Sequence, residues 1–155
     1  LPSALRDLAA AAAVRGDLTV DVDADGWPAG ERTAADPLLY RTAGELLNNV
    51  VKHAQATSAT VTLALAGDTA RLVVADDGVG MPANAAAGAL RRGHIGLASH
   101  TLRIDAAGGR FTSAPGEPRG TVVTGELPVL RSEDTGVVPH VDRRPDGVDG
   151  SAAAS

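Results

Sequence analysis

The order of hydrophobic and polar positions predicts a helix, a strand and a second helix in the first third of the chain. The segment ALRDLAAAAAVRG (4–16) has a helical pattern closed by Gly16, and LTVDVDA (18–24) alternates strictly, as a half-buried strand does. The second helix is expected to start at Pro37, which suits a first helical turn, and to run to about Ala56.

The middle and the end of the chain are predicted to contain mainly strands. ATVTLALAGDTARLVVAD (59–76) forms two apolar runs around an Ala-Gly-Asp-Thr turn, which indicates a hairpin. IGLASHTLRIDAAGG (95–109) is expected to be a helix closed by two glycines. Two further strands are expected in GRFTSA (109–114) and GTVVTGELPV (120–129).

Two segments carry no regular pattern. DGVGMPANAAAGALRRGH (77–94) is rich in Gly, Pro, Asn and small residues, which is typical of a mobile loop. From residue 131 onward Ser, Asp, Gly, Pro and Ala dominate, and no periodicity survives. The sequence therefore predicts one domain over 1–130 and a disordered tail over 131–155.

Composition excludes several classes of function. The chain of 155 residues is 44% hydrophobic, which suffices for a single core. Its net charge of -5 and its three aromatic residues argue against nucleic-acid binding, which needs cationic patches and stacking platforms. The absence of cysteine excludes disulfides and thiolate metal sites and suits a reducing compartment, so we expect a cytoplasmic domain.

Membrane association is expected only through parts of a longer parent protein. No apolar run approaches the roughly 18 residues of a membrane span, and no signal peptide is visible. The first residue is Leu1 and not Met, so we expect the chain to be a piece of a longer protein.

The segment GELLNNVVKHA (44–54) places several polar side chains on one helix. At about 100° per residue, the apolar residues form one core-facing stripe, and Glu45, Asn49 and Lys52 fall together on another side. The stripe consists of Leu39, Ala43, Leu46, Leu47, Val50 and Ala54. By itself this pattern leaves open a solvated face with a Glu-Lys pair.

Two glycine-containing segments add to this pattern. VVADDGVGM (73–81) leads an apolar strand into Asp76 and two glycines, where a carboxylate can accept a hydrogen bond from an exocyclic amine and so favour adenine over guanine. RGHIGLAS (92–99) places two glycines at a helix start, where free backbone N–H groups favour phosphate.

Together the three segments resemble the nucleotide site of the GHKL ATPase superfamily, most closely the catalytic ATP-binding domain of two-component sensor histidine kinases. ELLNNVVKHA is similar to the N box, DDGVGM to the first glycine box and GHIGL to the second. The compact N box and short lid resemble the branch of nitrate/nitrite sensor and thermosensor kinases. The resemblance implies an α+β fold of the Bergerat type, a two-layer sandwich with helices on one face of a mixed sheet and a short ATP lid.

The resemblance also implies roles for individual residues. Asn49 matches the Mg²⁺ ligand, and Glu45 matches a carboxylate that acts as general base or orients the accepting group. Asp76 would accept the adenine amine. The remaining ATP-binding residues would be Lys52, His53, Gly78, Gly80, Met81, Gly93, His94, Ile95, Gly96, Leu97 and Thr121.

The implied activity is donation of the γ-phosphate of ATP to a histidine on a separate dimerization domain. The acceptor helix of such kinases is missing from this chain, so the partners would be that domain of a parent homodimer and a response regulator. The helix after the second glycine box reads ASHTLRI and lacks the Met and Glu usual in this branch, while Arg103 keeps its place. His100 is expected either on the exposed surface of this helix or in the protein core.

Three alternatives stand beside this interpretation. A hydrolysing ATPase of the same superfamily would turn over ATP alone, and a degenerate docking module would lack transfer, although Glu45 and Asn49 argue against it. DVDADG (21–26) resembles the opening of an EF-hand, but Arg32 stands where the twelfth residue should be Glu. We therefore expect these aspartates on the solvent face of an edge strand.

Overall fold

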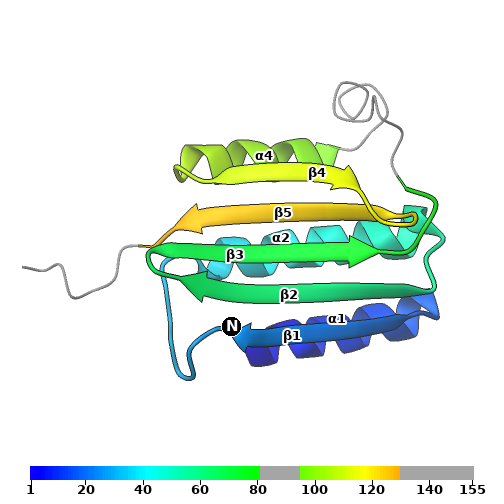
Figure 1. Cartoon of the computed structure of the whole chain (residues 1–155), viewed down its shortest axis with the longest axis horizontal. Coiled ribbons are helices and arrows are strands. Elements are labelled where there is room, and N and C mark those ends of the chain that lie inside the picture. The colour runs from blue at the N-terminus through cyan, green and yellow to red at the C-terminus, as the bar shows by residue number, and fades with distance from the viewer. Residues whose placement is uncertain (81–94, 130–155) are drawn as a thin grey trace, which may run out of the picture.

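The computed structural model describes residues 1–80 and 95–129 (Figure 1). Most of the loop predicted at 77–94 and the whole tail predicted at 131–155 lie outside these residues. The elements are α1 (Pro2–Gly16), β1 (Thr19–Gly26), α2 (Asp36–Asn49), the π-helix η1 (Val50–Ala54), β2 (Ser58–Ala66), β3 (Thr69–Asp76), α4 (Ile95–Ala106), β4 (Arg110–Pro115) and β5 (Thr121–Pro128).

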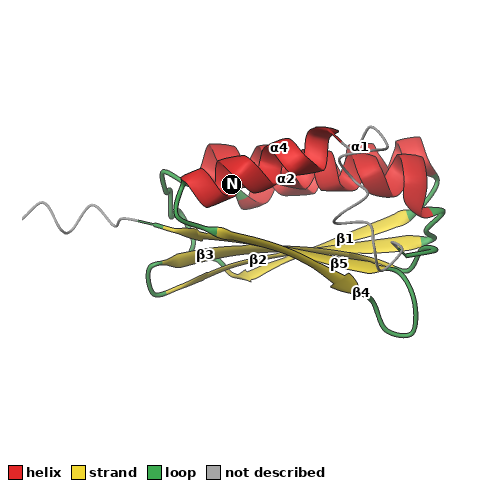
Figure 2. Ribbon diagram, turned by 90° about the horizontal axis from the view of Figure 1, so that it is seen from above, coloured by secondary structure: helices red, strands yellow, loops and turns green. Residues whose placement is uncertain are grey.

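The strands form one mixed sheet in the order β1-β2-β3-β5-β4. β1 pairs with β2 in parallel, and the other neighbours are antiparallel. Helices α1, α2 and α4 lie on one face of this sheet (Figure 2), with α2 packed against both other helices. The predicted two-layer α+β sandwich with a mixed sheet is therefore confirmed.

Alternation along the strands decides which side chains enter the core. In β5 the buried residues are Thr121, Val123, Gly125 and Leu127, which share the face that the helices cover. β1 lies at the edge of the sheet, and Asp21, Asp23 and Asp25 are exposed there, as the sequence predicts. The largest fully buried side chains are Leu5, Leu39, Leu47, Leu63, Leu72, Ile104, Leu127, Val61 and Thr42.

Local hydrogen bonds fix the start of α2, the helix that carries most of the candidate site. The Asp36 carboxylate accepts hydrogen bonds from the Thr33 backbone N–H (3.1 Å) and the Thr33 hydroxyl (2.7 Å). The Ala35 N–H donates to the Thr33 hydroxyl oxygen (3.2 Å). This arrangement resembles a capping box, and Pro37 follows in the first turn as expected.

Candidate functional site

The C-terminal end of β3 presents a carboxylate toward the helix layer. Asp76 pairs directly with Thr121 across β3 and β5, so both side chains lie on the same face of the sheet. Thr121 is buried, and its neighbours on that face belong to the core. The Gly78 N–H donates to the Asp76 Oδ1 at 2.8 Å. The structure therefore brings together two residues predicted to contact a base.

The surroundings of Asp76 favour its protonated form more than water does. Burial raises the pKa of the Asp76 carboxyl, and the nearby charge of Asp77 raises it further. Hydrogen bonds from the backbone of Gly78 and Thr121 lower the pKa and partly offset this effect. A further hydrogen bond from a donor that enters the site would stabilise this half-buried carboxylate.

Asp77 has a different role from its neighbour. Its carboxylate accepts hydrogen bonds from the Thr57 N–H (2.8 Å), the Thr57 hydroxyl (2.5 Å) and the Ser58 N–H (2.9 Å). These bonds, with that of the Thr57 hydroxyl first, hold the pKa of the Asp77 carboxyl well below its usual range. Asp77 thus ties the end of β3 to the start of β2, and its carboxylate is already occupied.

Gly78 brings the end of β3 against the end of η1. A Cβ atom at Gly78 would overlap the carbonyl oxygen of Ala54, and the Val79 N–H donates to that same oxygen at 2.8 Å. Gly80 has a φ of 78°, a conformation that side chains disfavour. The first glycine box and the N box are therefore in direct backbone contact. Gly78 and Gly80 were expected to bind ATP, and the packing of Gly78 against Ala54 was not predicted.

The second helix differs from the prediction in its last part. The regular α-helix ends at Asn49, and the chain continues as the π-helix η1 to Ala54 before Gln55 adopts a left-handed φ of 50°. A π-helix has more residues per turn, so rotation per residue is smaller than the 100° that the sequence analysis assumed. The expected single arc of Glu45, Asn49 and Lys52 therefore holds for the first two residues and not for Lys52. Short π-helices of this kind are frequent at functional sites.

The polar residues of this helix occupy two environments. Glu45 and Asn49 are half-buried and lie four residues apart on α2, which places them on one face. Lys52 and His53 are exposed on η1. Arg71 forms an ion pair with Glu126 on the other face of the sheet, and within the described residues no ion pair joins Glu45 to Lys52. The alternative of a solvated Glu-Lys pair is therefore not supported.

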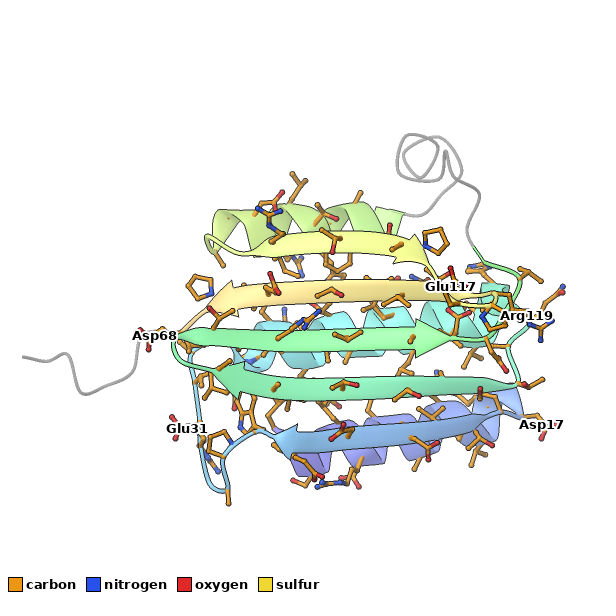
Figure 3. All side chains as sticks on the ribbon, in the orientation of Figure 1. Asp17, Glu31, Asp68, Glu117 and Arg119 are labelled. Atoms are coloured by element: carbon orange, nitrogen blue, oxygen red, sulfur yellow. The ribbon has the colours of Figure 1, made fainter. Side chains whose placement is uncertain are left out.

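The third predicted segment is described only in part. Ile95, Gly96 and Leu97 form the first turn of α4, whereas Met81, Gly93 and His94 lie outside the described residues. Figure 1 shows the start of α4, η1 and the end of β3 at the same end of the molecule. Glu117 and Arg119, in the loop between β4 and β5, also lie at this end of the sheet (Figure 3).

Sequence reasoning missed one polar contact next to the site. Thr42 on α2 is fully buried, and its hydroxyl lies 3.2 Å from Nδ1 of His100 on α4, which is itself buried. The departure of the segment ASHTLRI from the family pattern was the available signal.

The described side chains fit a magnesium ion only if a nucleotide shares its coordination. No group of three His, Cys, Asp or Glu residues within 1–80 and 95–129 could hold a metal ion. Asn49 offers a neutral oxygen, a ligand that Mg²⁺ accepts together with waters and phosphate oxygens. A Mg²⁺ ion at Asn49 would therefore depend on the phosphates of a bound nucleotide.

Comparison with known proteins decides the family. Residues 34–131 match the family described as histidine kinase-, DNA gyrase B- and HSP90-like ATPase. The chain belongs to this ATPase family. It is 44% identical over 131 residues to the sensor histidine kinase NarS of Mycobacterium tuberculosis (strain ATCC 25618 / H37Rv), a match that covers 84% of this chain and 30% of that protein. The predicted resemblance to the catalytic ATP-binding domain of sensor histidine kinases is thus confirmed.

Solved structures agree with this fold. Full-length ShkA in complex with AMPPNP has a TM-score of 0.71 at 22% identity, with 84% of this chain and 30% of that chain covered. The mycobacterial sensor histidine kinase MprB has a TM-score of 0.62 at 20% identity, with 82% and 93% covered. The chain thus spans 30% of the length of NarS and of ShkA. Within the described residues, no helix has the length and apolarity to cross a membrane.

Proposed function

We propose that this ATPase-family domain binds ATP with Mg²⁺ and donates the γ-phosphoryl group to a histidine on the dimerization domain of its parent kinase. The observation that carries the proposal is the contact of Gly78 with Ala54, because it joins the end of β3 to the helix of the N box. This contact supports the proposal that the adenine-binding candidate Asp76 and the phosphate-binding candidates Glu45 and Asn49 would bind one ligand.

The base would be recognised at the end of β3. Asp76 has an acceptor oxygen on the helix side of the sheet, which suits the exocyclic amine of adenine and disfavours the oxygen that guanine carries there. The hydroxyl of Thr121 lies beside it. Gly78 and Gly80 would shape the base pocket, and Met81 would pack near the base.

The triphosphate would lie along the helix face. Asn49 would complete the shell of a Mg²⁺ ion bound to the phosphates, and Lys52 and His53 would contact the phosphates from η1. The segment that would close over the phosphates runs from Gly93 to Leu97 and includes His94 and Ile95. This part of the proposal rests on the resemblance of GHIGL to the second glycine box and on the start of α4 at Ile95.

In the transfer step the acceptor nitrogen attacks the γ-phosphorus, the bond to the bridging oxygen breaks, and ADP leaves. Glu45 would take the proton of the attacking nitrogen or orient the ring. Such chemistry depends mainly on positioning and charge stabilisation. Of the described histidines, His100 is buried on α4 against Thr42 of α2, and His53 on η1 is expected to contact the phosphates, so the acceptor is expected on a partner helix.

The test is a transfer assay with separated parts. The 155-residue chain, incubated with radiolabelled ATP and Mg²⁺, should take up almost no acid-labile phosphate and release little free phosphate. Addition of the dimerization helices of the parent protein should lead to labelling of that partner, and Asn49→Asp should strongly reduce the label. Fast release of phosphate by the chain alone would instead support a hydrolysing ATPase. Labelling of the partner would exclude a docking module without activity.

A further inference from the structure

Thr42 and His100 form a polar contact inside the apolar interface between α2 and α4. The Thr42 Oγ1 and His100 Nδ1 atoms are 3.2 Å apart, and the two residues have exposed fractions of 0% and 9%. Thr42 lies between the buried residues Leu39 and Leu46 of α2, and His100 precedes the fully buried Ile104 by four residues. Both side chains therefore occupy positions that helical periodicity would give to apolar residues.

Each of these two groups satisfies the other. A buried hydroxyl or imidazole nitrogen without a partner is costly, and a hydroxyl can donate to or accept from either neutral form of the ring. A sliding movement of α4 along α2 would separate both groups from their partner. The pair thus specifies one register between these helices, which apolar side chains alone specify less sharply.

Burial, with the nearby arginines, favours the neutral form of the His100 ring. Burial is the main cause that lowers the pKa of the His100 imidazole, and Arg103 on α4 and Arg41 on α2 lower it further. Glu45 on α2 acts in the opposite direction. β4 and β5 turn no titratable group toward the helix layer near it, since their buried or half-buried helix-side residues are Phe111, Thr121, Val123, Gly125 and Leu127.

This contact lies between two parts of the candidate site. Thr42 and Glu45 are three residues apart on α2 and are therefore neighbours on its surface, and the charge of Glu45 reaches His100. On the other helix, His100 lies five residues after Ile95, where α4 begins. A shift at this pair would move the start of α4 relative to Glu45.

We propose that His100 is a positioning residue for nucleotide binding, which holds α4 in register with α2 through Thr42 and keeps Glu45 oriented. The inference rests on the proposed function, because it assigns His100 to the same ATP site. Protonation of His100 would place a cation in the helix interface and change Nδ1 into an obligate donor. The register, and with it the affinity for nucleotide, therefore weakens as the pH falls through the pKa of His100, which lies below the ordinary histidine value.

The experiment compares the wild-type 155-residue chain with three variants. His100→Asn keeps a neutral hydrogen-bonding group near the position of Nδ1, His100→Leu removes it, and Thr42→Val/His100→Leu makes the whole contact apolar. For each protein, thermal unfolding and the affinity for a fluorescent ATP analogue with Mg²⁺ are measured at two pH values. One lies above the ordinary histidine pKa of about 6.5, at pH 7.5, and the other lies below the midpoint that NMR titration gives for His100, whose pKa is lowered. The ring of His100 is also titrated by NMR in wild type and in Glu45→Gln, without nucleotide.

At pH 7.5 His100→Asn should bind within about twofold of wild type, and His100→Leu should bind about fivefold more weakly. The double variant should regain thermal stability relative to His100→Leu but not affinity, because an apolar contact does not restore the register. His100→Asn should also lose the part of the pH dependence that wild type shows between the two pH values. In Glu45→Gln the pKa of His100 should fall, because the charge that raises it is gone.

Two results would overturn the inference alone. One is unchanged affinity in His100→Leu with only a lower unfolding temperature, which would reduce the pair to a structural contact. The other is an unchanged pKa of His100 in the Glu45→Gln variant. If wild type itself binds no ATP analogue, the proposed function fails and the inference fails with it, and this outcome is distinct because the first two leave wild-type binding intact.

Discussion

Asp76 and Thr121 are direct partners across β3 and β5, with their side chains on the face that the helices cover. Asp77, the next residue, is bound instead to Thr57 and Ser58 at the start of β2. The two adjacent carboxylates therefore have different roles. Asp76 faces the candidate base site, and Asp77 connects the end of β3 to the start of β2. This separation can be tested with single substitutions.

Replacement of Asp76 should weaken adenine recognition. Asp76→Ala would leave the exocyclic amine unpaired in a closed pocket, which costs about 1–3 kcal/mol, or roughly 5- to 150-fold in affinity. Titration with a fluorescent ATP analogue measures the loss of affinity, and titration with a GTP analogue is the control. The ratio of the two affinities should be smaller in Asp76→Ala than in wild type. Unchanged affinity for the ATP analogue would remove Asp76 from the site.

The acid stability of the domain should depend on Asp77. Its folded pKa lies below its unfolded value of about 3.9, so the unfolded state binds more protons in this range. The stabilisation is therefore present above pH 4 and is lost as the pH falls toward the folded pKa. Asp77→Asn should lower the unfolding temperature at pH 7 and flatten its decline between pH 5 and pH 2.5, values that bracket the ordinary Asp pKa of about 3.9. Asp21→Asn, on the exposed face of β1, is the control, and equal curves for both variants would contradict the assignment.

Glycine at position 78 should be required by the backbone of Ala54. Gly78→Ala would force the end of β3 away from η1, and we expect a loss of about 1–3 kcal/mol in the free energy of unfolding. Gly44→Ala is a matched control within α2, because its new methyl group would meet only Leu8, at 3.7 Å. That variant should gain about 0.5–1 kcal/mol from helix propensity. Chemical denaturation of both variants measures these changes in the free energy of unfolding, which should have opposite signs.

Substitutions at Asn49 and Glu45 should separate binding from transfer. In the proposed ATP site, Asn49→Asp would add a negative charge near the phosphates and should weaken Mg²⁺-dependent binding of the ATP analogue roughly tenfold. Glu45→Gln keeps the shape of the side chain but removes its basicity, so binding should stay within about twofold and transfer should slow by about 100-fold. A Glu45→Gln variant that labels the dimerization helices at the wild-type rate would end the assignment of Glu45 as a base.

Most of the elements could be predicted from the sequence, because their patterns are local. The hairpin around residues 66–69, the edge strand β1 and the apolar stripe of α2 are all present. The end of α2 could not be predicted in the same way. The change from α-helix to π-helix covers only five residues, which is too short to produce a recognisable sequence period. The direction of the Lys52 side chain therefore could not be predicted from the sequence.

The candidate site divides in the same manner. Asn49, Asp76 and Thr121 could be singled out from their residue types and from the resemblance to a family. The contact of Gly78 with Ala54 and that of His100 with Thr42 join residues 24 and 58 positions apart, which no local pattern reveals. The sequence does not distinguish a glycine that is required by close packing against a carbonyl group from one that is required by a turn.

The sequence by itself determined the succession of helices and strands, the face that each one buries, and the polar residues available for chemistry. Periodicity and residue type carry this information, because side-chain direction repeats with the backbone geometry of each element. Only the tertiary structure decided that the Asp76 carboxylate faces the helix layer beside Thr121, whereas the Asp77 carboxylate is bound to Thr57 and Ser58. It also decided that a polar pair, and not an apolar one, joins α2 to α4. Such outcomes depend on distances between segments remote in the chain, and those distances are set by the packing of the whole core around them.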